Sequence, residues 1–153
     1  MISSQTLQFY PLFAHQSAEM LAKISNLAEE KEVDAGFHLF FEGEVAKSFY
    51  LIHDGSVILT MNMGEKGDKR VEELEPIGKG EVAGWSSIVK PHIYKLGAYT
   101  GQKSHLIYFN GEKLRALFDD NPAYGYFFMQ KLAEVIGDRL ISKCVQIMSM
   151  MEG

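Results

Sequence analysis

The sequence predicts a mostly β domain, an antiparallel sandwich or barrel, with helices before and after it. Three observations support this fold class. Residues 32–109 contain short β-rich runs separated by glycines, and no helical period persists there for long. The segments on either side carry apolar residues at helical spacing. A chain of 153 residues also suits one domain with a buried core.

Six runs rich in β-branched and aromatic residues are predicted to be strands, because turn residues bound each of them. They cover residues 38–41, 49–52, 57–61, 71–74, 95–100 and 106–109. The polar residues 64–68, Gly-Glu-Lys-Gly-Asp, are expected at the tip of a hairpin.

Three helices are predicted from capping residues and apolar spacing. Ser17 is expected to cap a helix that ends near Leu27. Asn110 is expected to cap a short helix over residues 112–118. Asn121 and Pro122 are expected to open the last helix, because asparagine is a good N-cap and proline favours the first helical position. This helix is predicted to run to about residue 150.

Composition limits the partners that the chain is expected to have. A net charge of −5 argues against a nucleic-acid surface, because phosphate binding needs clustered lysine and arginine. The one cysteine, Cys144, cannot form an internal disulfide. No signal segment opens the chain and no apolar run is long enough to span a bilayer, so we expect a cytoplasmic protein without membrane contact.

Enzyme activity is not expected. The histidines are scattered and form no His-x-His pair, which argues against a metal site, and no cofactor is expected. No Gly-x-Ser-x-Gly nucleophile motif is present. The five histidines are His15, His38, His53, His92 and His105.

The segment 80–89, Gly-Glu-Val-Ala-Gly-Trp-Ser-Ser-Ile-Val, is the strongest candidate for a ligand loop. Gly80 and Gly84 bracket a short apolar pair, and Ser86 and Ser87 stand at the start of a helical turn that Pro91 stops. Backbone N–H groups after a glycine and at a helix N-terminus form an anion-binding nest. The alternative is a turn with a structural role alone.

Two further segments extend the pattern: residues 35–43, Ala-Gly-Phe-His-Leu-Phe-Phe-Glu-Gly, and residues 48–57, Ser-Phe-Tyr-Leu-Ile-His-Asp-Gly-Ser-Val. In order with segment 80–89, they resemble the cyclic-nucleotide-binding domain of the catabolite activator and protein kinase A regulatory subunit superfamily. The resemblance covers nearly the whole chain. It implies a jelly-roll barrel, the cupin-like double-stranded β-helix, over residues 1–120, and a dimerisation helix over residues 121–153.

The chain departs from the family pattern where the ligand would bind. In that family an acid after a glycine accepts a hydrogen bond from the ribose, and an arginine pairs with the cyclic phosphate. Aligning Gly80 and Gly84 with the two family glycines puts Trp85 in place of the acid, and tryptophan has no acceptor. A shifted register would instead pair Gly80 with Glu81.

The family arginine is also missing. Counting back from Ala98 puts His92 at its position, while counting forward from Trp85 puts Tyr94 there. Lys95 offers a point charge nearby, without the planar fork of arginine. The alternatives are a surface-loop histidine and a solvated strand lysine.

The Gly-Trp-Ser core is similar to that of a divergent bacterial branch of this superfamily. Trp85 either fills the pocket or stacks on a flat or apolar ligand, with the serine hydroxyls and neighbouring N–H groups holding a carboxylate or phosphate. The candidate ligand-binding residues are Gly84, Trp85, Ser86, Ser87, His92, Tyr94 and Lys95.

The last helix carries an apolar stripe that outlasts the barrel. In the resembled family this helix packs along its counterpart in a second subunit, so we expect a homodimer; the alternative is a helix folded back on the barrel. The stripe comprises Ile136, Leu140, Cys144, Ile147 and Met151.

Two function classes remain open. The first is a regulatory module for signal transduction that senses a small anion, a cyclic nucleotide or another, and biases the last helix. The second is a dimerisation scaffold whose pocket Trp85 fills. Transcription factors of the family carry a helix-turn-helix domain after this helix, and none fits in the residues that follow here. We therefore expect either a free-standing sensor module or part of a longer protein, and no direct DNA binding by this chain.

Overall fold

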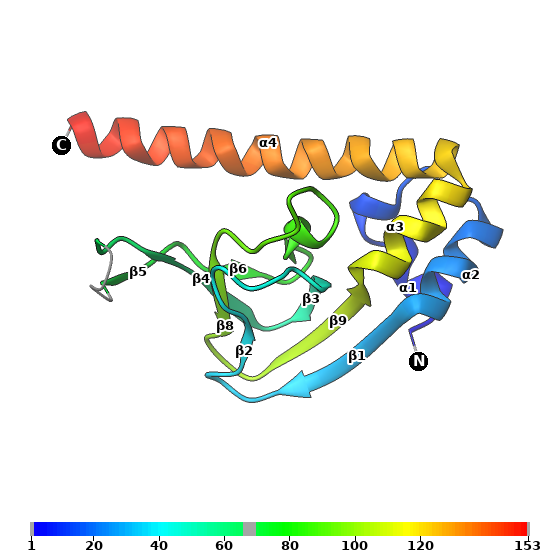
Figure 1. Ribbon diagram of the computed structural model, residues 1–153, viewed down its shortest axis with the longest axis horizontal. Helices are drawn as coiled ribbons and strands as arrows, with labels where there is room; N and C mark the ends of the chain where they lie inside the picture. Colours follow the sequence, from blue (N-terminus) through cyan, green and yellow to red (C-terminus); the bar gives the residue numbers. More distant parts are fainter. Residues whose placement is uncertain (1, 66–69, 153) are drawn as a thin grey trace.

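A computed structural model describes residues 2–65 and 70–152. Two antiparallel sheets form a jelly roll, and helices gather at one end of it beneath the start of a long final helix (Figure 1). One sheet has the order β1-β9-β3-β7; the other has the order β2-β8-β4-β5, with β6 also paired to β4. The strands are β1 (Ala28–Val33), β2 (His38–Phe40), β3 (Ser48–Asp54), β4 (Ser56–Asn62), β5 (Val71–Glu73), β6 (Ile77–Gly78), β7 (Val82–Ala83), β8 (Gly97–Thr100) and β9 (Ser104–Asn110).

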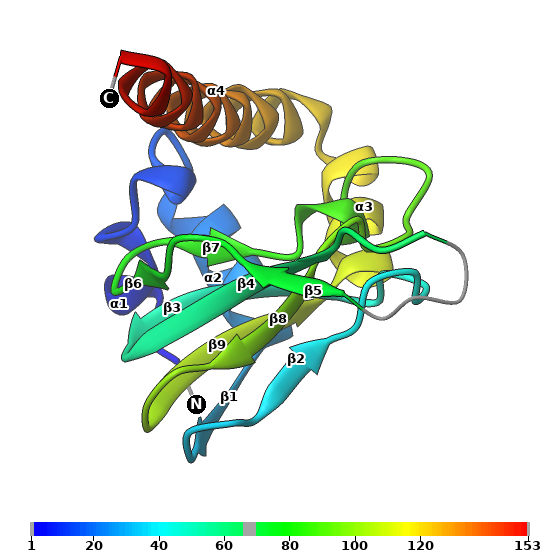
Figure 2. The same cartoon turned by 90° about the vertical axis from the view of Figure 1, so that its left-hand side faces the viewer.

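The α-helices come before and after the barrel strands in the chain, and the short turn η2 lies between β7 and β8. Figure 2 shows α4 on the far side of the molecule from β1 and β2, with the strands layered below it. The helical elements are α1 (Ser4–Gln8), η1 (Pro11–Phe13), α2 (Ala18–Leu27), η2 (Trp85–Ser87), α3 (Gly111–Asp120) and α4 (Pro122–Glu152). The mostly β fold with flanking helices is therefore confirmed.

All six predicted strands are present, with ends shifted by a few residues. Three strands were not predicted. Strand β1 is rich in Glu and has no fully buried residue, which suits a strand at the sheet edge that pairs with β9. Strands β6 and β7 have two residues each, too few to show an alternating pattern. Residues 66–69 of the expected hairpin tip lie outside the described residues.

Two of the three predicted caps are confirmed. Ser17 Oγ accepts from the N–H of Met20 at 3.1 Å, and Asn110 Oδ1 accepts from the N–H of Lys113 at 3.0 Å. Asn121 behaves differently, because it links two helices. Its side-chain Nδ2 donates to the carbonyl of Leu117 at 2.9 Å and so serves the end of α3, where carbonyls lack helical partners.

Strand β3 separates two hydrophobic cores. Successive residues of a strand point to opposite faces. Phe49 and Leu51 pack into the core beneath the helices, whereas Tyr50 and Ile52 pack inside the barrel. The helix-side core also receives Phe128 from α4, so this helix is tied to the barrel through its first half.

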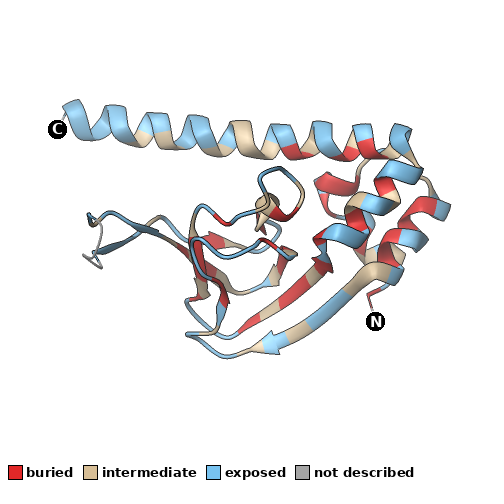
Figure 3. Ribbon diagram, in the orientation of Figure 1, coloured by how far each residue is buried: buried red, intermediate tan, exposed pale blue. Residues whose placement is uncertain are grey.

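The second half of α4 is exposed along its apolar residues (Figure 3). The exposed residues are Leu140, Ile141, Val145, Ile147, Met148, Met150 and Met151. The helix runs above the barrel without burying these side chains against it, so the predicted dimer remains a prediction that fits this surface.

Within the described residues, no helix is both long and apolar enough to cross a membrane.

Candidate ligand site

The loop between β6 and η2 has left-handed backbone conformations at the two glycines that bracket it. Gly80 and Gly84 both have positive φ, +88° and +82°. A Cβ added at Gly84 would lie 2.7 Å from the carbonyl oxygen of Ser48, so only glycine fits there. The loop thereby comes close to β3 before η2 begins at Trp85.

Five of the seven predicted site residues line one small pocket at the barrel mouth, of about 110 Å³. They come from two segments, the loop and the chain that enters β8. The five are Gly84, Trp85, Ser86, Tyr94 and Lys95. The two segments that the sequence predicts to form the site therefore lie side by side in the structure. Contact of these residues with a ligand remains a prediction.

Ser87 and His92 are placed elsewhere and brace the loop. Ser87 is fully buried, and its Oγ donates to the carbonyl of Gly84 at 2.7 Å. Its own carbonyl accepts from Nε of Arg115 on α3 at 3.1 Å. His92 has a φ of +60°, and its Nδ1 lies 2.9 Å from the carbonyl oxygen of Ser86. Neither lines the barrel-mouth pocket.

Tyr94, at one of the two positions expected for the family arginine, is committed to the barrel. Its hydroxyl donates to the Ser48 carbonyl at 2.7 Å and accepts from the Ser48 N–H at 3.0 Å. Its ring stacks on Phe40 with centroids 3.9 Å apart and an interplanar angle of 8°. Burial raises the pKa of Tyr94, so the hydroxyl stays protonated at neutral pH. Both rings line the barrel-mouth pocket.

A residue missed by sequence reasoning, Arg139, stands beside the loop. Its guanidinium carbon lies 4.8 Å from the ring centroid of Trp85, a cation–π distance, and its Nη2 donates to the carbonyl of Val82 at 2.9 Å. Burial lowers the pKa of Arg139, and the charge of Glu81 opposes that shift. The sequence feature that could have indicated Arg139 is its position one helical turn after Val135, on the face of the helix toward the barrel.

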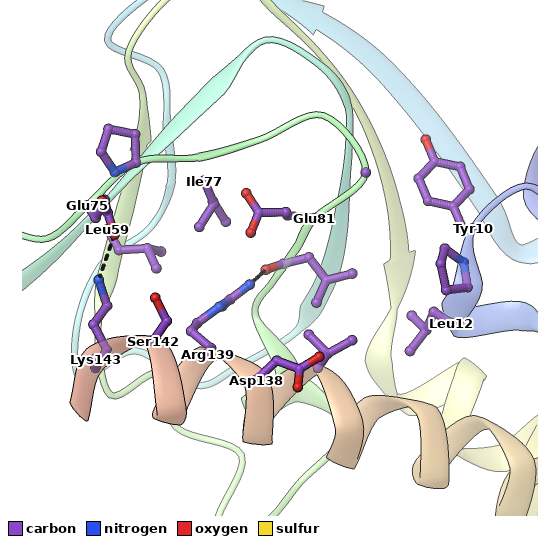
Figure 4. A pocket seen from close by; sticks show the side chains of 15 residues that line it. Tyr10, Leu12, Leu59, Glu75, Ile77, Glu81, Asp138, Arg139, Ser142 and Lys143 are labelled. Atoms are coloured by element: carbon purple, nitrogen blue, oxygen red, sulfur yellow. Dashed lines mark hydrogen bonds and ion pairs between the residues drawn. The ribbon is translucent and has the colours of Figure 1, made fainter. Parts of the chain in front are cut away.

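A second, larger cavity of about 330 Å³ lies beneath α4 (Figure 4). Arg139 and Leu59 line both this cavity and the barrel-mouth pocket. On its far side Nζ of Lys143 lies 3.6 Å from a carboxylate oxygen of Glu75. Glu81 Oε2 accepts from the N–H of Gly78 at 2.7 Å, which fixes the turn before β7.

Comparison with known proteins decides the family. Residues 30–121 match the cyclic nucleotide-binding domain. The chain belongs to that family. This stretch contains most of β1, strands β2 to β9, the loop and all of α3, so the matched region is the barrel just described.

Solved structures agree with this assignment. A Geobacter metallireducens protein named a cyclic nucleotide-binding protein has a TM-score of 0.81 and 28% identity, with 92% of this chain and 99% of that chain covered. The Thermus thermophilus catabolite activator protein has a TM-score of 0.70 at 20% identity, covering 92% of this chain and 63% of that one. The second similarity shows the fold alone.

Among curated proteins, the cGMP-dependent protein kinase isozyme 1 of Drosophila melanogaster is 29% identical over 83 residues. The match covers 54% of this chain and 11% of the kinase. The chain therefore corresponds to a small part of that enzyme.

In the described residues no group of three or more His, Cys, Asp or Glu side chains is arranged to hold a metal ion.

Proposed function

We propose that this domain is a regulatory sensor that binds a small anionic ligand beside the loop and transmits binding through α4. The observation that carries the proposal is the contact of Arg139 with the loop. This one side chain, from the long helix, touches both the Val82 carbonyl and the Trp85 ring. A ligand that favours one placement of α4 over another would shift the equilibrium between them.

The usual cyclic-nucleotide contacts are not reproduced by the side chains at the family positions. The alignment of Gly80 and Gly84 with the family glycines puts Trp85 in the place of the acid, and the Tyr94 hydroxyl is engaged with Ser48. The barrel-mouth pocket of about 110 Å³ is also small, because ligand sites typically measure about 300–1,000 Å³. We therefore propose that the ligand is not a cyclic nucleotide bound through the acid and the arginine that the family uses.

Two copies are proposed to pair through the second half of α4. Leu140 and Ile147 are 62% and 57% exposed, and they recur at heptad spacing among other exposed apolar residues of this half. In this proposal the pairing carries the output, since ligand binding and dimer geometry share one helix. A regulatory rather than catalytic role in the cytoplasm accords with this arrangement.

A second function is favoured by the packing of the barrel mouth. The stacked rings of Phe40 and Tyr94, together with Trp85, leave little room there. A scaffold that dimerises and binds no ligand would be built in this way.

Thermal unfolding separates the two functions. The protein would be heated with cyclic AMP, cyclic GMP, other nucleotides and small carboxylates in turn. A ligand present at about a hundred times its dissociation constant adds roughly 2.7 kcal/mol to the free energy of unfolding. A rise in Tm with any one of them supports the sensor. No rise with any of them contradicts the sensor and supports the scaffold.

A further inference from the structure

The side chain of Arg139 is half-buried, and among the described residues no carboxylate lies at ion-pair distance from it; the charge of Glu81 acts on it from farther away. Within residues 2–65 and 70–152, no carboxylate oxygen lies within 4.0 Å of its guanidinium nitrogens. Among the described residues, its hydrogen-bond partner is the neutral carbonyl of Val82. Arginine offers five N–H donors. A partly desolvated cation with donors to spare is a group that a bound anion would stabilise.

The other basic side chain of the cavity beneath α4 is already engaged. Lys143 lies beside Glu75 at 3.6 Å, and both line this cavity. Figure 4 shows the Lys143–Glu75 pair at one end of the cavity and Arg139 nearer its middle. Arg139 is therefore the cation in this cavity that is available to a ligand.

The walls of the cavity limit what can lie against Arg139. Apolar side chains make up much of the lining, among them Leu12, Ile77 and Val135. The carboxylates of Glu81 and Asp138 also line it, and they would repel an anion of high charge. A single negative charge on an apolar body fits this combination, whereas a nucleoside triphosphate does not.

The volume of the cavity beneath α4 also suits a small-molecule ligand. At about 330 Å³ it lies within the range of small-molecule sites, while the barrel-mouth pocket at about 110 Å³ lies below it. We infer that Arg139 is an anion-binding residue, and that it holds an aryl or alkyl carboxylate whose apolar body occupies the cavity beneath α4. This inference rests on the proposed sensor function and names its ligand class.

Such a ligand would act directly on α4. Among the described residues, polar contacts from the second half of this helix to the barrel are made by Arg139 to Val82, and by Lys143 and Gln146 to Glu75. A carboxylate bound at Arg139, with its body against Ile77, would add a connection between helix and barrel close to the midpoint of α4. The helix would then be held more firmly over the barrel when the ligand is present.

Trp85 provides the readout. It is the only tryptophan in the chain, and it lies against the guanidinium of Arg139. Benzoate, phenylpropionate and hexanoate would be titrated while its fluorescence is followed, with the uncharged amide of each acid as a matched control. Calorimetry would give the dissociation constants. We expect at least one carboxylate to bind and its amide to bind at least about tenfold more weakly.

Variants locate the anion. Arg139→Gln is expected to weaken carboxylate binding about 10- to 100-fold, because a hydrogen-bonded ion pair is lost. Arg139→Lys keeps the charge and is expected to lose less. Lys131→Gln, which removes a paired cation of α4 that does not line the cavity, is expected to change binding less than about threefold. Circular dichroism and thermal unfolding of each variant would establish that it is folded.

The outcomes separate this inference from the sensor function. Equal binding to the wild type and to a folded Arg139→Gln variant overturns the inference and leaves the sensor. The same holds if cyclic nucleotides bind and the carboxylates do not. Amides that bind as well as the acids overturn the inference and also contradict the sensing of an anion. If no carboxylate and no nucleotide binds the wild type, the inference and the sensor function both fail.

Discussion

The two halves of α4 have the same backbone geometry and opposite surroundings. In the first half Phe128 and Leu132 are fully buried, and Phe128 lies within 6.0 Å, centroid to centroid, of both Phe13 and Phe49. In the second half apolar residues of similar size, such as Leu140 and Ile147, remain more than half exposed. The helix is thus one element with two kinds of apolar face.

This difference indicates separate roles for the two halves. The first half fixes the helix on the domain, because it completes the core beneath α3 and the N-terminal helices. The second half has an apolar surface that its own chain does not bury, which suits a second copy of the chain. Arg139 lies just past the junction of the two, where a ligand could change how the second half is held.

The largest expected effect lies in the buried half. Phe128→Ala removes a fully buried ring that stacks on Phe118 at 4.8 Å, and leaves a cavity. We expect the free energy of unfolding to fall by about 3–5 kcal/mol. Urea denaturation followed by circular dichroism measures this. Val145→Ala, in the exposed half, is the matched control and should change monomer stability by about 0.5 kcal/mol at most. Equal losses from both variants would contradict the division of the helix.

The exposed half should instead control association. Leu140→Lys combined with Ile147→Lys places two charges on the expected pairing surface. We expect the dimer dissociation constant to rise at least about tenfold, because each buried aliphatic side chain contributes about 1.5–3 kcal/mol. Sedimentation equilibrium would measure it. A wild-type protein that stays monomeric at high concentration, or a variant that pairs as well as wild type, would contradict the dimer.

Two glycines of α4 give the smallest and sharpest contrast. A Cβ at Gly125 would lie 2.8 Å from Cβ of Phe118, so Gly125→Ala should destabilise the packed half. A Cβ at Gly137 would meet nothing within 4 Å, so Gly137→Ala should raise the free energy of unfolding by about 0.5–1 kcal/mol through helix propensity. Thermal unfolding of the two variants is the check. Destabilisation by Gly137→Ala would mean that the helix is tightly packed at its midpoint.

Local signals in the sequence predicted much of the fold. Ser17 and Asn110 cap helices where expected, because an N-cap depends on a few neighbouring residues. Strand β1 was missed because its charged residues resemble a solvated loop, and its strand character depends on pairing with β9. That pairing is a tertiary property which no local pattern reveals.

The candidate site shows the same limit more clearly. The loop 80–89 was found because its glycines and serines are close in sequence, and the structure places Gly84 and Ser86 in one pocket with Tyr94. Arg139 was missed because it is more than fifty residues away and reaches the loop only when α4 lies across the barrel. The family pattern places its arginine close to the loop in sequence, so it gives no indication of a residue on the last helix.

Hydrogen–deuterium exchange with and without ligand would show whether binding beside the loop is transmitted to α4. Cyclic AMP and phenylpropionate would be added in separate experiments, and exchange would be followed in residues 82–88 and 138–152. We expect that a compound which slows exchange in the loop also changes exchange in the second half of α4. Protection of the loop with unchanged exchange in the helix would contradict it.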